Sequence, residues 1–162
     1  MHPVISWKIC LTLAGTFCAI SACKAVETAA PFQATLGGHV EYSFNGGISG
    51  HRQSLTIDDT GLIDARDDKH KKMARGQLAP ARLADLRAAF MKIKENPETA
   101  KQRLGARCAD CIHYSVRATI DGRHHQVDVN SVALQASPYH EVVQSLSQIL
   151  SETLTRSARV NE

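Results

Sequence analysis

The sequence predicts an α+β domain in which an antiparallel β-sheet of about five strands carries two main helices on one face. Stretches that alternate apolar and polar residues, as half-buried strands do, occur both before and after a stretch with helical spacing. A second stretch with helical spacing closes the domain. The resulting order of strands, helix, strands and helix is typical of the α+β class.

The first half of the domain is expected to form a meander. Alternation over 40–44 and again over 53–57 predicts two strands. The segment 58–61 is a predicted turn, because its Asp and Gly residues tolerate turn backbone angles. A shorter strand is expected over 62–65, followed by a basic loop over 66–77. The cluster Lys69-His70-Lys71-Lys72 with Arg75 is interpreted as solvated, and contact with anionic lipid or an acidic partner is the alternative.

Proline marks the start of each predicted helix. Pro80 begins the first, where the missing N–H costs nothing. Its apolar stripe has spacings of three and four and comprises Leu83, Leu86, Phe90 and Ile93. A short second helix is predicted from Asn96, a capping residue followed by Pro97, to Gly105.

The second half of the domain predicts a hairpin and a closing helix. Alternation over 112–120, the turn Asp121-Gly122 and the return over 124–129 indicate two antiparallel strands. Ser137-Pro138 is expected to begin the last helix. The apolar stripe of that helix comprises Tyr139, Val142, Val143, Leu146, Ile149, Leu150 and Leu154.

Residues 1–22 predict export. The apolar run over 9–20 is roughly a dozen residues, which suits a signal peptide and is too short for a membrane span. A buried core helix is the alternative for a run of this length. Ile20-Ser21-Ala22-Cys23 resembles the cleavage and lipidation box of bacterial lipoproteins. That resemblance implies cleavage before Cys23 and acylation of Cys23. Ordinary cleavage after Ala29-Ala30 is the alternative, and the following proline disfavours it.

The predicted organisation follows from this leader. Residues 23–38 form a lipidated tether, 39–156 a single domain and 157–162 a disordered tail. The expected location is the bacterial cell envelope, lipid-anchored and facing the periplasm. Lys24 after the lipidated residue implies the outer membrane, by resemblance to enterobacterial sorting.

The charge balance argues against a nucleic-acid partner. The formal net charge is +3, and removal of the leader takes away only Lys8. So weak a bias does not predict nucleic-acid binding. Phosphate loops and dinucleotide motifs are also absent from the sequence. We therefore expect a monomer that binds a protein partner and the membrane, with no cofactor, no metal and no catalytic residue.

Cys108 and Cys111 are the two cysteines outside the leader and its lipidation site. In an oxidising periplasm such a pair predicts a disulfide. Redox catalysis is an alternative, although the pair runs into a strand rather than a helix. A zinc site is another, with His124 or His113 as a further ligand.

Two catalytic motifs are near misses. His140-Glu141 would begin a zincin motif, but Gln144 stands where the second His is required. Ser49 follows Gly47 as in a nucleophile elbow, but His51 occupies the place of the second glycine. Neither a metalloprotease nor a hydrolase is therefore predicted.

The order of these elements resembles the emfourin-like proteins, whose founding member inhibits the thermolysin-type (M4) metalloprotease protealysin. The matching features span roughly 39–154: the glycine loop 46–50 between strands, the helix after Leu78-Ala79-Pro80, the Cys108–Cys111 segment, the Asp121-Gly122 hairpin and the Pro-led last helix. The longer insertion over 94–107 and the basic stretch depart from the simplest pattern. The resemblance implies a compact inhibitor without cofactor or catalytic residues.

The resemblance and the loop composition together predict a binding loop, whereas the glycine spacing by itself favours an ordinary turn. It comprises Gly46, Gly47, Ile48, Ser49 and Gly50, with Ile48 as the apolar anchor. A rigid, glycine-bent loop could offer Ile48 to the apolar pocket beside a protease metal. Two alternatives stay open: a non-enzymatic envelope lipoprotein with an interaction or assembly role, and a metal or redox module built on the cysteine pair.

Overall fold

A computed structural model describes residues 35–47, 50–93, 103–104, 108 and 110–160. The predicted signal peptide, Cys23 and residues 24–34 of the predicted tether lie outside these ranges. Within them, the helices are too short or too polar to span a membrane.

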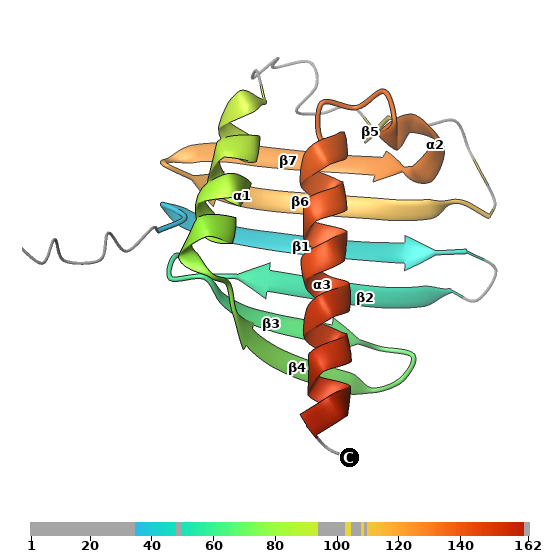
Figure 1. The fold of residues 1–162 in the computed structure, drawn as a ribbon. Helices are drawn as coiled ribbons and strands as arrows, with labels where there is room; N and C mark the ends of the chain where they lie inside the picture. The colour runs from blue at the N-terminus through green and yellow to red at the C-terminus, as the bar shows by residue number, and fades with distance from the viewer. Residues whose placement is uncertain (1–34, 48–49, 94–102, 105–107, 109, 161–162) are drawn as a thin grey trace, which may run out of the picture. The chain divides into compact units, whose positions relative to one another are not determined.

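A seven-stranded sheet forms the body of the domain (Figure 1). The strands are β1 Gly38–Gly46, β2 His51–Ile57, β3 Leu62–Asp67, β4 Lys72–Gln77, β5 Arg103–Leu104, β6 Ile112–Ile120 and β7 Arg123–Asn130. Their order across the sheet is β4-β3-β2-β1-β6-β7-β5. Six strands pair antiparallel, and the two-residue β5 pairs parallel with β7. The α+β prediction is confirmed, with more strands than the five expected.

Two helices cover one face of this sheet. Figure 1 shows α1 Pro80–Lys92 and α3 His140–Val160 lying side by side across the strands. The predicted stripe of α1 is buried along its length, with Phe90 0% exposed. On α3 the stripe is buried from Val142 to Leu150, and it faces the inward residues of the central strands. The alternating strand positions and the helical stripes together form a single core.

A partly buried hydrogen bond ties α3 to the centre of the sheet. The hydroxyl of Tyr42 on β1 lies 2.6 Å from Oγ of Ser147 on α3. Burial raises the pKa of Tyr42 to about 12, although the hydrogen bond to Ser147 opposes the shift. The phenol is therefore neutral at physiological pH and acts as a structural polar contact.

The basic stretch over 66–77 is a hairpin rather than a loop over its whole length, whereas the basic cluster 69–72 is exposed as predicted, with 69–71 in the turn of that hairpin. β3 continues to Asp67, and β4 returns from Lys72 to Gln77 in antiparallel register. The inward positions of β4 include Ala74 and Gly76, which are small, whereas the outward Met73 is 66% exposed. Alternation of apolar and polar residues is therefore almost invisible in β4.

The predicted tether also ends earlier than its stated limit at residue 38. Leu36 is fully buried, and its amide donates a hydrogen bond to the carbonyl of Asp59. The amides of Gly37 and Gly38 donate to the carboxylate of Asp59 at 2.7 and 3.1 Å. Residues 36–38 therefore belong to the domain.

The remaining boundaries differ in smaller ways. A four-residue helix, α2 Ser131–Leu134, follows β7 and is capped by the side chain of Asn130. α3 begins at His140 rather than at Ser137-Pro138, and it continues through most of the predicted tail to Val160. The helix predicted to end at Gly105 is wrong over 103–104, which form β5. Its residues 96–102 lie outside the described ranges.

Candidate functional site

The predicted binding loop is the turn that joins β1 to β2 at one end of the sheet (Figure 1). Gly46 pairs with His51 as the last pair of the hairpin. The amide of Gly50 donates a hydrogen bond to the carbonyl of Gly47 over 3.1 Å, which closes the turn. Two predicted loop residues lie outside the described ranges, Ile48 and Ser49.

Gly46 is packed directly against the neighbouring strand β6. Its φ of 134° is one that side-chain-bearing residues rarely adopt. A β-carbon at this position would also overlap the carbonyl oxygen of Cys111 and lie 3.1 Å from the Cα of Ile112. The root of the turn therefore requires glycine, and it is held against the start of β6.

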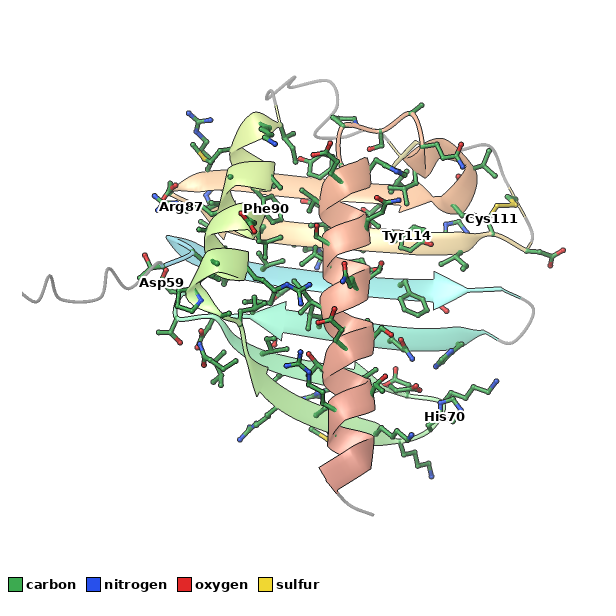
Figure 2. All side chains as sticks on the ribbon, in the orientation of Figure 1. Asp59, His70, Arg87, Phe90, Cys111 and Tyr114 are labelled. Carbon is green, nitrogen blue, oxygen red and sulfur yellow. A yellow bond between two sulfur atoms is a disulfide. The ribbon has the colours of Figure 1, made fainter. Side chains whose placement is uncertain are left out.

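The two cysteines lie at this same end of the sheet. Cys108 and Cys111 are joined in a disulfide, with their Cα atoms 5.4 Å apart (Figure 2). Cys111 is 6% exposed and directly precedes β6. The tertiary structure thus brings the glycine turn and the cysteine pair, which are distant in sequence, next to each other.

This placement argues against the metal and redox uses of the cysteines. The pair leads into a strand, and so lacks the helix N-terminus that lowers the pKa of a reactive thiol. His124 is placed opposite Thr119, eight residues along β6 from Cys111. At about 3.4 Å per residue this separation is roughly 27 Å. The interpretation of His124 as a ligand beside Cys111 is therefore wrong.

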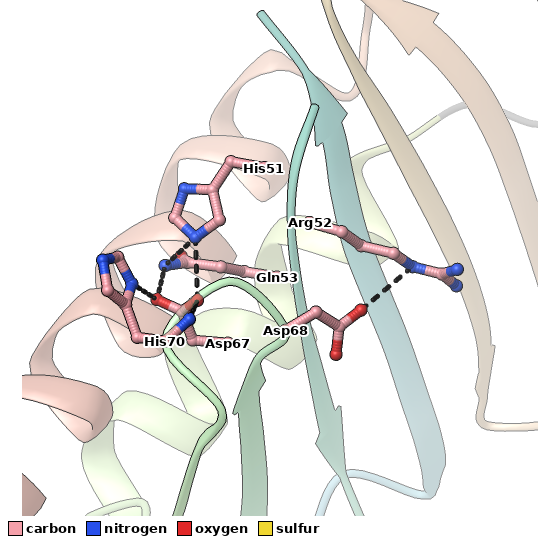
Figure 3. A network of polar contacts seen from close by, with 6 residues as sticks. All are labelled: His51, Arg52, Gln53, Asp67, Asp68 and His70. Atoms are coloured by element: carbon pink, nitrogen blue, oxygen red, sulfur yellow. Dashed lines mark hydrogen bonds and ion pairs between the residues drawn. The ribbon is translucent and has the colours of Figure 1, made fainter. Parts of the chain in front are cut away.

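A polar cluster that the sequence did not reveal lies beside the turn (Figure 3). The side chains of His51 at the start of β2 and His70 in the β3–β4 turn both point at the carboxylate of Asp67. Nε2 of His51 is 2.8 Å from Oδ1, and Nδ1 of His70 is 2.9 Å from Oδ2. Gln53 donates to Oδ2 over 2.7 Å, and the backbone amide of His70 donates to Oδ1 over 3.0 Å. We call His51, Gln53, Asp67 and His70 the histidine–aspartate cluster.

Asp67 is the buried centre of this cluster. Its side chain is 6% exposed, whereas those of His51 and His70 are 22% and 54% exposed. Burial by itself would raise the pKa of the Asp67 carboxyl. The hydrogen bonds from the side chain and backbone of His70, and those from His51 and Gln53, nevertheless hold that pKa well below its usual range. The carboxylate is therefore ionised at neutral pH.

We expect this cluster to make the domain lose stability as the pH becomes acidic. The folded pKa of Asp67 lies below its unfolded value near 3.9, so the folded state binds fewer protons. The stability that the ionised Asp67 contributes is fully present above the unfolded pKa and is lost as the pH falls through the folded pKa. His51, His70 and Gln53 face this carboxyl, and Lys72 is placed opposite it on β4.

The measurement is urea unfolding at a series of pH values from 6 down to 2, which covers the loss of stability that begins near the unfolded pKa of Asp67. Replacing Asp67 by Asn removes the titrating group, so the variant should lose less stability than the parent below about pH 4. An equal pH dependence for the two proteins would contradict the assignment.

Aromatic rings extend from this cluster across the neighbouring strands. His51 contacts His70 and Phe44, with ring centroids 5.5 and 6.0 Å apart, and Phe44 in turn lies 6.4 Å from Tyr114. Phe44 and Tyr114 are partly buried against the core. This aromatic row, formed by Tyr114, Phe44, His51 and His70, runs from β6 to the β3–β4 turn beside the root of the glycine turn.

Sequence reasoning missed the cluster because its members are separated along the chain. Only the register of β2 against β3, in which Gln53 pairs with Asp67, brings them together. The one signal in the sequence was the alternation of β2, which places two polar residues on its core-facing side. His51 and Gln53 continue the series of Leu55 and Ile57 on the core face, where polar residues need partners.

The zincin near miss lies elsewhere. His140 and Glu141 occupy the first turn of α3, and Gln144 is exposed on the same helix. The histidine–aspartate cluster comes from β2, β3 and the β3–β4 turn instead. Glu141 is exposed as well, whereas His140 is half-buried.

Comparison with known proteins does not assign a family. The chain matches no protein-family model, and no curated protein matches it.

Proposed function

We propose that this chain is an exported, lipid-anchored protein that binds a protein partner through the β1–β2 turn, and that it inhibits a thermolysin-type metalloprotease. The observation that supports the proposal best is the packing of Gly46 against the carbonyl of Cys111. It holds the root of the turn against the start of β6, which Cys111 of the Cys108–Cys111 disulfide directly precedes. A partner would therefore meet a turn whose base is already ordered.

An ordered turn matters because a ligand that loses little conformational entropy on binding binds a protease cleft more tightly. The hydrogen bond between Gly47 and Gly50 closes the turn, and the hairpin register continues from Gly46 into β1. Phe44 and Tyr114 add half-buried aromatic surface beside the root. Aromatic residues are enriched in protein-binding surfaces.

The alternative of an envelope lipoprotein without inhibitory activity uses the same surface. Both functions act by contact between proteins, so they differ only in the effect on a protease. An inhibition assay therefore separates them, and it also tests the turn directly.

Replacing Ile48 by Asp should weaken inhibition of a thermolysin-type protease by about 30-fold or more, the loss expected for a central anchor. A carboxylate would have to be desolvated in the apolar pocket where the isoleucine is expected to bind. The measurement is the inhibition constant of full-length protein in detergent against a panel of thermolysin-type proteases.

Leu62→Asp is the matched control. Leu62 is 44% exposed at the start of β3, at the opposite end of the sheet from the turn. The same change of apolar residue to carboxylate there should leave inhibition unchanged. A parent protein that inhibits none of the panel would exclude the inhibitory function. Equal inhibition by the parent and a folded Ile48→Asp variant would remove the turn from the mechanism.

A further inference from the structure

The histidine–aspartate cluster has the donor set of a metal site. The ligand atoms of His51, Asp67 and His70 all lie within 4.8 Å of one another. Two imidazole nitrogens and a carboxylate are the combination that divalent transition metals such as Zn²⁺ favour. No metal is expected from the sequence, and a cation here would be a property of the domain beyond the proposed contact with a protein.

We propose that His51, Asp67 and His70 bind a divalent transition-metal cation of the Zn²⁺ type. Nε2 of His51 and Nδ1 of His70 approach the two different oxygens of the Asp67 carboxylate. Each approach is now a hydrogen bond through an imidazole N–H. A cation among the three groups would replace those protons and satisfy both nitrogens and the carboxylate together.

The spacing is close to what a metal requires. With metal–ligand bonds of about 2.1 Å, a tetrahedral site holds its ligand atoms about 3.4 Å apart. The two nitrogen–oxygen pairs already lie at 2.8 and 2.9 Å. Drawing the more widely spaced atoms together requires side-chain rotation, which the half-exposed ring of His70 can make.

The exposure of the three side chains sets the side from which a cation would enter the site. Asp67 forms the floor of the site with a side chain 6% exposed, and His70 forms its outer wall at 54%. Three protein ligands leave the fourth position for water or for a ligand from a partner, as in zinc sites with an open position. Lys69 and Lys71 flank His70, but their exposed ammonium groups are screened by solvent and salt.

Two further groups orient the carboxylate without being ligands. Gln53 donates to Oδ2, and the backbone amide of His70 donates to Oδ1. Such outer hydrogen bonds fix the direction of a metal-binding carboxylate and sharpen affinity. The arrangement is thus a set of convergent donors with its supporting shell.

The position of the site gives the cation a structural consequence. His51 pairs with Gly46 at the root of the β1–β2 turn, while His70 lies in the β3–β4 turn. A cation held by both would join these two turns at the same end of the sheet. Because it would bind the folded chain and not the unfolded one, it should raise the melting temperature.

The test is direct titration of the full-length protein, carried in detergent without a histidine tag, with Zn²⁺ and with Co²⁺. We expect one equivalent of Zn²⁺ to bind and the melting temperature to rise until that equivalent is reached. Mg²⁺ should not have this effect, since it prefers oxygen ligands. The Co²⁺ complex should show ligand-field bands without sulfur-to-metal charge transfer, which distinguishes this site from cysteine ligation.

Matched variants separate metal binding from folding. His70→Asn keeps an N–H able to donate to Asp67 but removes the imidazole, and it should weaken Zn²⁺ binding by about tenfold or more. His51→Asn should do the same from the other side of the site. His124→Ala removes an exposed histidine on β7 and should bind Zn²⁺ as the parent does.

The proposal is overturned if the parent binds neither Zn²⁺ nor Co²⁺, or if both asparagine variants retain the parent affinity. It is also overturned if the His124→Ala variant is the one that loses the metal. None of these outcomes alters the inhibition assay, so failure of the metal site and failure of the proposed function are distinguishable.

Discussion

Replacing Phe90 by Ala is expected to lower the free energy of unfolding by about 3–5 kcal/mol, the largest effect of any single substitution considered. Phe90 is fully buried on the sheet-facing side of α1 (Figure 2). Its ring lies 5.2 Å from that of His125 on β7, which in turn lies 6.4 Å from Tyr139 before α3. Removal of the ring leaves a cavity where α1, β7 and the approach to α3 meet.

Chemical denaturation followed by far-ultraviolet circular dichroism measures this loss. Met91→Ala is the control, because Met91 is 39% exposed on the same helix and its truncation should change stability by about 0.5 kcal/mol or less. The denaturant dependence of the unfolding free energy should be unchanged in both variants. Similar stabilities for the two would mean that α1 does not pack on the sheet through Phe90.

Replacing Gly38 by Ala should be nearly as damaging, at about 3 kcal/mol. A β-carbon at Gly38 would overlap the carbonyl oxygen of Thr119 and lie 2.7 Å from its carbonyl carbon. These are backbone atoms of β6, so no change of rotamer relieves the contact. The clash falls where Gly38 pairs with Ile120, in the longest ladder of the sheet.

Gly122→Ala is the control that distinguishes this steric clash from backbone strain. Gly122 has a φ of 77°, and a β-carbon there would meet nothing within 4 Å. Its replacement should therefore cost only the left-handed penalty of about 1–2 kcal/mol. If Gly38→Ala proved as stable as the parent in the same denaturation assay, residue 38 would belong to the tether after all.

The elements with strong apolar periodicity could be predicted from the sequence. The stripe of α1 and the alternating positions of β6 are rich in large apolar residues. Such a pattern specifies both the type of element and the face that it buries. β4 escaped prediction because small inward residues, Ala74 and Gly76, suffice beside α3. Leu36 escaped because one apolar residue between polar ones has no period to detect.

The candidate site, too, was predictable from the sequence only in part. The glycine turn was visible in the sequence, since a run of glycines between two strands marks a sharp connection. Its contact with Cys111 was not, because that contact depends on the pairing of β1 with β6. The convergence of His51 and His70 on Asp67 likewise required the register of two hairpins.

By itself, then, the sequence determined the α+β class, both main helices and the position of the turn, because local periodicity and turn chemistry are read along the chain. Only the tertiary structure decided which residues meet at the end of the sheet. Strand register places residues from distant segments within hydrogen-bonding distance, and a shift of one residue would turn Asp67 to the opposite face. The proposed metal site exists in that register alone.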